Sequence, residues 1–270
     1  PGGKGNNQAV ACARLGAKTR FIGRVGNDPF GPGVLETIAK ENVDVSNILV
    51  DQKNDTGIAI ISVDDSAENA IIVIAGANMA MDDSDVERAI SIMDDANVLL
   101  LQLEVSPKPN FRVAKEAKQH GLTVILDPAP IHPIPDEVFP LIDFLTPNEV
   151  ETEGIVGFKP SNKEEAAQAA KILREKGVKT AIIKMGALGA CYDSPQGSGF
   201  VQAFKVEPID TVAAGDAFNG GLAVAISEGK SIEEAVRWGA AAGAIATTRK
   251  GALPAMPYRY ELSKLLEEQS

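Results

Sequence analysis

Cysteine is scarce in this sequence of 270 residues, which contains only Cys12 and Cys191. The two lie far apart in apolar stretches and form no Cys-x-x-Cys spacing, so nothing indicates a disulfide framework or a zinc site of that kind. The two histidines, His120 and His132, stand near no serine or cysteine pattern, which argues against a catalytic histidine. We therefore expect a reduced, cytoplasmic protein.

Long apolar runs are also missing, because no stretch approaches the ~18 residues of a membrane span. The first residues lack the charged and then apolar order of a signal peptide. Positive charge is deficient too, since 37 Asp and Glu face 26 Lys and Arg, a formal net charge of -11. Nucleic-acid binding needs a basic surface, so the expected partners are small molecules, and neither nucleic acid nor membrane. A few local donors can still hold a nucleotide.

What the sequence does contain is enough apolar material for a core, with 44% hydrophobic residues. Short β-branched runs alternate with amphipathic stretches, which predicts an α/β fold with a mostly parallel sheet and helices on both faces. The expected strands are residues 19–24, 98–103, 123–127, 144–146 and 180–185. The expected helices are residues 31–41, 83–94, 108–120, 163–176, 214–227 and 231–248.

One region breaks this alternation. Residues 56–63 and 70–75 are both strand-like, and the residues between them are polar, which predicts a hairpin. Such a hairpin is either an edge of the main sheet or a flap over the site, and the sequence favours neither.

Unusual polar residues follow several expected strands. Glu104 follows the strand at 98–103, Asp127 begins Asp-Pro-Ala-Pro, and Asn148 lies in Thr-Pro-Asn-Glu. Ligands of open α/β sheets bind at the carboxyl ends of the strands, so these residues are site candidates.

The segment 210–221, Asp-Thr-Val-Ala-Ala-Gly-Asp-Ala-Phe-Asn-Gly-Gly, carries the strongest chemical signal. Free N–H groups at Ala213, Ala214 and Gly215, with the positive end of the helix dipole, would form an anion hole. Asp216 beside it can take a proton from an alcohol during group transfer. An acid that merely complements the helix dipole explains the local pattern equally well.

Three weaker patterns remain open. The start, Gly-Gly-Lys-Gly-Asn-Asn-Gln, is either a ligand loop or a flexible terminal loop, and it is not a Walker A motif. The Asn148–Glu151 spacing suits Mg²⁺ held through water, although a helix N-cap is the simpler explanation. Residues 184–189 follow a strand and lie either along a nucleotide or in a plain tight turn.

Taken together, the chain resembles the ribokinase branch of the PfkB carbohydrate kinase family from residue 2 to about residue 257. The motifs fall in the family's order, and the segment at 210–223 is highly specific. They are GGKGNNQAVA (2–11), AGAN (75–78), LQLE (101–104), DPAP (127–130), TPNE (146–149), DTVAAGDAFNGGLA (210–223) and TRKGALPAMP (248–257).

The resemblance implies a single Rossmann-like α/β sandwich of three layers over residues 1–270, with a small β lid at about 56–75. It implies transfer of a phosphoryl group from ATP to D-ribose, with Asp216 as the base and the anion hole at 213–215. The residues implied to bind the sugar or the transferring phosphate are Gly3, Lys4, Gly5, Asn7 and Glu104. Those implied to bind the nucleotide, its phosphates and Mg²⁺ are Asn148, Glu151, Lys184, Gly186, Gly189 and Gly215.

The resemblance also implies a monovalent cation, usually K⁺, beside the anion hole. The matching positions are the side chain of Asp210 and the backbone at Val212, Ala246, Arg249, Gly251 and Ala255. A homodimer is compatible with the resemblance.

Three departures from the family pattern stand out. The sequence starts after the family's first strand, whose Asn-x-Asp contributes to sugar binding, so we expect an open strand edge, an incomplete lid and weak kinase activity. Asn6 stands where ribokinases usually carry alanine, and Ala240 where some relatives place a polar residue.

Three rival interpretations stay open: a sibling kinase for another sugar or a nucleoside, a catalytically silent binding protein, and a dehydrogenase. The absence of Gly-x-Gly-x-x-Gly after a first strand counts against the dehydrogenase.

Overall fold

The computed structural model describes residues 2–63 and 69–269. The helices are α1 Lys4–Arg14, α2 Gly31–Lys40, α3 Asp83–Ile90, α4 Pro107–Gln119, α5 Glu149–Val156, α6 Lys163–Glu175, α7 Ala214–Ser227, α8 Ile232–Thr247 and α9 Arg259–Glu268. The strands are β1 Thr19–Arg20, β2 Gly23–Gly26, β3 Val43–Asp44, β4 Ile48–Asp51, β5 Ile58–Val63, β6 Asn69–Ile74, β7 Val98–Leu101, β8 Thr123–Leu126, β9 Phe144–Leu145, β10 Thr180–Lys184, β11 Gly189–Ser194 and β12 Gly197–Gln202. Within the described residues, no helix is both long and apolar enough to cross a membrane.

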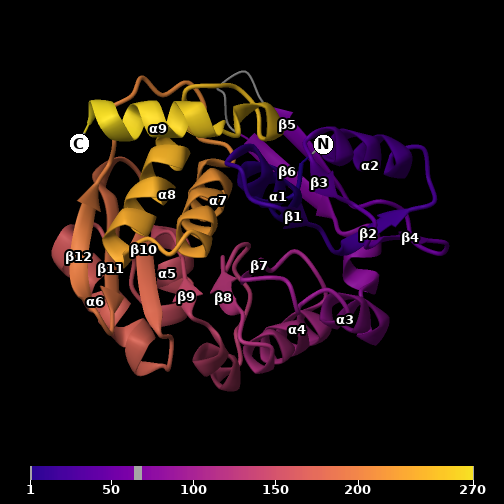
Figure 1. Ribbon diagram of the computed structural model, residues 1–270, viewed down its shortest axis with the longest axis horizontal. Coiled ribbons are helices and arrows are strands. Elements are labelled where there is room, and N and C mark those ends of the chain that lie inside the picture. The colour runs from indigo at the N-terminus through magenta and orange to yellow at the C-terminus, as the bar shows by residue number, and fades with distance from the viewer. Residues whose placement is uncertain (1, 64–68, 270) are drawn as a thin grey trace.

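The main sheet has the order β12-β11-β10-β9-β8-β7, and it runs from one side of the molecule to its middle (Figure 1). Strands β7 to β10 are parallel, whereas β11 and β12 are antiparallel. The mostly parallel sheet expected from the sequence is therefore confirmed. The hairpin β11–β12 and the short pairs β1–β3 and β2–β4 were not predicted.

Both faces of this sheet are buried. Ile125 and Ile182 pack into a core with α1, α7 and α8. Their neighbours Val124 and Ile183 point to the other face and pack with α4 and α6. Because consecutive side chains of a strand point to opposite faces, apolar runs rather than alternation produce this arrangement. The three-layer α/β sandwich is thus confirmed.

The strand expected at 19–24 is interrupted, which corrects that prediction. Thr19 and Arg20 pair with β3, whereas β2 pairs with β4 in a separate sheet. The N–H of Phe21 still donates to the carbonyl of Asp44, but the segment between β3 and β4 then turns, and the N–H of Ile48 donates to the carbonyl of Val45, so the first pairing ends there. The helix expected at 83–94 also ends early, at Ile90.

The predicted hairpin is present as β5 and β6, which pair antiparallel from Ile58–Ile74 to Val63–Asn69. They form their own sheet, so the hairpin is not an edge of the main sheet. The polar turn expected between them, at 64–68, lies outside the described residues. Ile60, Ile72 and Ile74 lie on one face of the hairpin and are exposed, which leaves an apolar face without cover among the described residues.

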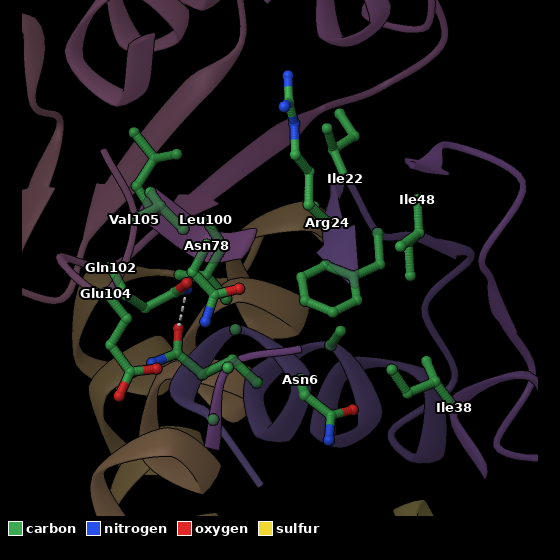
Figure 2. Close-up of a pocket in the computed structure, with 18 of the residues that line it drawn as sticks. Asn6, Ile22, Arg24, Ile38, Ile48, Asn78, Leu100, Gln102, Glu104 and Val105 are labelled. Carbon is green, nitrogen blue, oxygen red and sulfur yellow. Dashed lines mark hydrogen bonds between the residues drawn. The ribbon is translucent and has the colours of Figure 1, made fainter. Parts of the chain in front are cut away.

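Strand β7 ends the main sheet and pairs with β8 alone among the described residues. Beside it lies a cavity of about 1610 Å³ whose walls come from α1, β1, β2 and the β7 region. Figure 2 shows Ile22, Leu100 and Ile48 on this wall, together with Glu104 and Gln102. The other edge of β7 is therefore unpaired within the described residues.

Candidate active site

The polar residues predicted at strand ends do converge. Glu104 follows β7, Asp127 directly follows β8, and Asn148 follows β9. Their edge of the sheet meets the first turns of α1 and α7, which lie next to each other. Gly220 on α7 permits this approach, since a Cβ there would lie 2.5 Å from the Cβ of Ala11.

Asp216 lies in the first turn of α7 and is only 4% exposed. Asn7 Nδ2 donates to its Oδ2 at 2.8 Å, and Gln8 Nε2 donates to its Oδ1 at 2.9 Å. Burial raises the pKa of Asp216, while the charge of Lys4 and these two hydrogen bonds oppose the rise. The Oδ1 atom of Asn7 is buried and finds no partner within the described part of the chain, which leaves an acceptor beside Asp216.

The predicted anion hole is present in part. Ala213 adopts a left-handed conformation with φ 59°, and it caps α7 without a side-chain hydrogen bond. The N–H groups of Ala213 and Gly215 have no partner among residues 2–63 and 69–269. The N–H of Ala214, however, donates to the carbonyl of Thr211 at 3.3 Å, so the expectation that it is free is wrong. The left-handed residue turns the chain back on itself, and this closes that bond.

The glycine-rich start is a helix rather than a flexible loop. Lys4 begins α1, and its backbone N–H donates to Glu104 Oε2 at 2.7 Å, which joins two predicted sugar-binding residues. Gly3 caps the helix, and a Cβ on Gly5 would come within 3.1 Å of Phe21. Packing therefore already explains the glycine at position 5.

The ammonium of Lys4 is half-buried and makes no ion pair with the described residues. Burial alone would lower the pKa of Lys4, but surrounding carboxylates outweigh it and raise that pKa. These carboxylates belong to Asp216, Asp127, Glu151 and Glu104. Burial also raises the pKa of Glu104 and of Glu151. The site thus concentrates acids around one unpaired cation, a distribution typical of functional sites.

Asn148 and Glu151 form a capping box at the start of α5. Asn148 Oδ1 accepts from the N–H of Val150 and of Glu151, and Glu151 Oε2 accepts from the N–H of Asn148 at 2.8 Å. The simpler N-cap interpretation is confirmed, and it leaves the Mg²⁺ role untested. No cluster of three His, Cys, Asp or Glu side chains in the described residues is arranged to hold a metal directly.

The segment 184–189 is a tight turn, as one of the two interpretations proposed. Gly189, with φ 120°, is required by packing, because a Cβ there would lie 2.0 Å from the carbonyl oxygen of Val201. Gly186 also has a positive φ, of 50°. Lys184 does not extend along an open surface: its Nζ binds Asp127 Oδ1 at 2.9 Å, and its side chain is 11% exposed.

The loop positions predicted to hold a monovalent cation do come together. Asp210 Oδ1 accepts from the N–H of Val212, and its Oδ2 accepts from the N–H of Gly251 at 2.9 Å. The N–H of Asp210 itself donates to the carbonyl of Thr247, at the end of α8. The carboxylate thereby ties the loop before α7 to the segment holding Arg249 and Ala255. Carboxylate and carbonyl oxygens are suitable ligands for a hard cation, so these residues fit K⁺.

Two polar residues at the site, Gln8 and Gln102, were not singled out by sequence reasoning. Gln8 binds both Asp127 and Asp216, and Gln102 binds Gln8. Asp127 was named as a site candidate from its position after a strand, and the structure places it beside Gln8. Nothing in the sequence singled out Gln8 or Gln102, because helical and strand placement alone brings them together.

Similarity to known proteins extends over nearly the whole chain. The model of the pfkB family carbohydrate kinases matches residues 1–259. A ribokinase of Haemophilus influenzae is 41% identical over 266 residues, which are 98% of this chain and 87% of the relative. Ribokinase from Thermotoga maritima has a similar structure, with a TM-score of 0.89 and 37% identity over 99% of this chain and 88% of that one. The structure of Arabidopsis thaliana ribokinase complexed with ribose and ATP is also similar, with a TM-score of 0.91. It is 35% identical in sequence, and the match covers 98% of this chain and 87% of that one.

Proposed function

The chain belongs to the pfkB family of carbohydrate kinases, and from this premise we propose that it transfers the terminal phosphoryl group of ATP to D-ribose, giving ADP and ribose 5-phosphate. The relatives named ribokinase, one of them solved with ribose and ATP, support this choice of substrates. The observation that carries the proposal is Asp216, a buried carboxylate at the start of a helix with unpaired N–H groups beside it.

Asp216 takes the proton from the primary hydroxyl of the sugar as the new O–P bond forms. The bond between the γ-phosphorus and the bridging oxygen breaks, and ADP leaves with that oxygen. The N–H groups of Ala213 and Gly215, at the positive end of the α7 dipole, stabilise the charge on the transferring group. Positioning and electrostatics contribute most to phosphoryl transfer, so one base and one anion hole suffice.

The sugar lies between α1 and the end of β7. Glu104 accepts from sugar hydroxyls, and the unpartnered Oδ1 of Asn7 accepts from another. Gly3 and Gly5 keep the start of α1 close to the ligand, and the ammonium of Lys4 contacts the sugar or the transferring phosphate. Lys4 suits this role because no described carboxylate pairs with it directly.

The nucleotide phosphates face α5 and the turn after β10. Asn148 and Glu151 would hold Mg²⁺ through water, which suits an ion that dehydrates reluctantly. When bound, Mg²⁺ neutralises charge on the phosphates. The turn at Gly186 and Gly189 borders the nucleotide. Lys184 lies behind this turn and is held by its ion pair with Asp127.

A monovalent cation, K⁺, belongs to the proposal through Asp210 and the backbone at Val212, Ala246, Arg249, Gly251 and Ala255. Asp210 and Val212 lie in the segment that leads into the anion hole, and Asp210 binds the N–H of Gly251 in the segment after α8, so a cation here would fix the N–H groups of Ala213 and Gly215. Turnover should therefore be several-fold higher in potassium than in lithium at equal ionic strength. Equal rates in the two salts would remove the cation from the proposal.

Assembly and location complete the proposal. The exposed apolar face at Ile60, Ile72 and Ile74 suits a homodimer, because an uncovered face of this kind marks an interaction surface. The free, buried thiols of Cys12 and Cys191 suit the reducing cytoplasm.

A coupled ADP-release assay over ribose, 2-deoxyribose, fructose and adenosine tests the function. We expect the highest kcat/KM with ribose and little ADP release without sugar. A preference for adenosine or fructose would indicate a related kinase of the same family with a different substrate. ATP binding without turnover of any acceptor, in protein whose intact mass matches the sequence, would instead indicate a silent binding protein.

A further inference from the structure

A buried glutamine joins two carboxylates at the centre of the site. Gln8 Nε2 donates to Asp216 Oδ1 and to Asp127 Oδ2, both at 2.9 Å. Gln8 is fully buried and Asp127 is 1% exposed. Two anions this close repel each other unless donors lie between them, and here one amide group supplies both donors.

The orientation of this amide is fixed by its other end. Gln102 Nε2 donates to Gln8 Oε1 at 2.6 Å, the bond drawn from Gln102 in Figure 2. The backbone carbonyl of Gln102 accepts separately from Asn110 Nδ2 at 2.7 Å, which holds the main chain at this position. Turning the Gln8 amide over would place its oxygen against two carboxylates, so only one orientation is compatible with these neighbours.

The second carboxylate has its own counter-ion. Lys184 Nζ lies 2.9 Å from Asp127 Oδ1; the Asp127 side chain is buried, and that of Lys184 is mostly covered. The same Nζ lies 3.4 Å from where a Cβ on Gly215 would stand, directly under the anion hole. A continuous buried chain therefore runs from Lys184 through Asp127 and Gln8 to Asp216.

We propose that Asp127, acting through Gln8, positions the carboxylate of Asp216 for proton transfer, with Lys184 balancing the charge of Asp127. This inference rests on the proposed function. Gln8 and Asn7 hold one oxygen each of Asp216, so its remaining lone pairs are directed by the two amides. Gln8, Asp127 and Lys184 are positioning residues, since none of them takes the proton.

The charged neighbours of Asp216 allow the proposal to be tested through the pKa of Asp216. From α1 it faces Lys4, and from the strand ends it faces Asp127 and Glu104. Lys184 and Glu151 complete the set of charged neighbours. The Gln8 hydrogen bond lowers the pKa of Asp216, whereas the charge of Asp127 raises it. Changes at the two residues should therefore move this pKa in opposite directions.

The experiment compares Gln8→Leu and Asp127→Asn with the parent chain. Each should lower kcat about tenfold to hundredfold, because a displaced base loses the alignment for transfer. KM for ribose and for ATP should stay within about threefold of the parent. The acidic limb of the kcat/KM profile should move to higher pH in Gln8→Leu and to lower pH in Asp127→Asn. A carboxyl ¹³C NMR titration of Asp216 should follow the same directions without any turnover.

Thr146→Val is the matched control, because it deletes another buried hydrogen bond to α7, the one from Thr146 to Asn219. It should lower stability without moving the acidic limb. The double variant Asp127→Asn with Lys184→Met removes both partners of the ion pair. It should be more active than the product of the two single effects, since no unpaired charge is left behind.

The outcomes separate the two proposals. Unchanged kcat and an unmoved titration of Asp216 in both single variants, with Asp216→Asn inactive, would overturn the positioning role alone. Limbs that move in the same direction would also overturn it. Full turnover in Asp216→Asn, or no sugar phosphorylation by the parent, would overturn the proposed function and this inference with it.

Discussion

Two clusters of buried carboxylates in this molecule behave in opposite ways. In one, Arg24 on β2 is surrounded by acids: its Nη2 lies 2.6 Å from Asp85 and 2.9 Å from Asp82, and its Nη1 lies 3.1 Å from Asp51. In the other, the acids around Asp216 share two lysines, and one of these, Lys4, is unpaired among the described residues.

The acids of the Arg24 cluster are satisfied. The N–H groups of Lys53 and Asn54, together with Arg24, lower the pKa of Asp51 to about 2. Hydrogen bonds from Ser84, again with Arg24, lower the pKa of Asp82 to about 2. Asp51 and Asp82 are therefore more stable as anions in the folded protein than in the unfolded chain.

The acids of the candidate active site are not satisfied. Burial raises the pKa of Asp216, Glu104 and Glu151, and neighbouring acids add to the rise. In this molecule the direction of the carboxyl pKa separates Asp51, which binds Arg24, from Asp216, although both side chains are buried.

Asp216→Asn should have the largest effect of these variants, which is the loss of kinase activity. The amide cannot accept the proton, so kcat should fall by about 10²–10⁴-fold. The dissociation constant for ATP should change little, and the free energy of unfolding should not decrease, because a buried carboxylate with a raised pKa is removed. ADP release, ATP titration and urea unfolding measure the three. A variant that keeps more than about a tenth of the parent rate would exclude the base role.

Asp85→Asn should break the fold instead. Asp85 is fully buried and binds Arg24, so loss of its charge leaves a buried cation without its main partner. Removing one partner of a buried pair costs about 3–5 kcal/mol, which urea unfolding would reveal. The activity of the molecules that stay folded should match the parent. Asp82→Asn is the control, because its side chain is 61% exposed and asparagine caps a helix equally well; its cost should stay below about 1 kcal/mol. Equal costs in the two variants would contradict the argument.

Glu104→Ala should weaken the binding of ribose and leave the binding of ATP nearly unchanged. Loss of a charged acceptor should weaken ribose about tenfold to hundredfold, while ATP affinity stays near that of the parent. Separate calorimetric titrations decide it. Because Glu104 also accepts from the N–H of Lys4, Glu104→Gln serves as the control that keeps a hydrogen-bond acceptor for α1. A similar loss for both ligands would assign Glu104 to the fold.

The carboxyl groups of both clusters should make the free energy of unfolding depend on pH. This is the smallest of the expected effects. Asp51 and Asp82 have folded pKa values lowered from 3.8 to about 2, so their contribution to stability is present above pH 4 and is lost as the pH falls towards 2. Asp216, Glu104 and Glu151 have raised values, so their contribution is present at low pH and is lost as the pH rises through those values.

Urea midpoints across pH 2–7 test both signs. Asp82→Asn should flatten the acidic branch below pH 4, and Asp216→Asn should flatten the decline above it. The urea midpoint of Asp216→Asn could still decline above pH 4 as the parent's does. That result would show that folding does not raise the pKa of Asp216.

The sequence by itself determined the alternation of strands and helices, since apolar periodicity and β-branched runs are local properties. It determined α7 to the residue, because Ala214–Ser227 begins after a small-residue turn and ends before Gly229. It also identified Asp216 and Glu104 as candidates, through their positions after an apolar strand or at a helix start.

Only the tertiary structure decided which groups meet. The 208 positions between Gln8 and Asp216, and the 57 between Asp127 and Lys184, carry no local pattern that links them. The structure also showed that Ala214 donates to Thr211, and that Lys184 is held by a buried acid. Hydrogen bonds and ion pairs between distant segments depend on how the sheet brings its strand ends together, and that packing is a property of the whole chain.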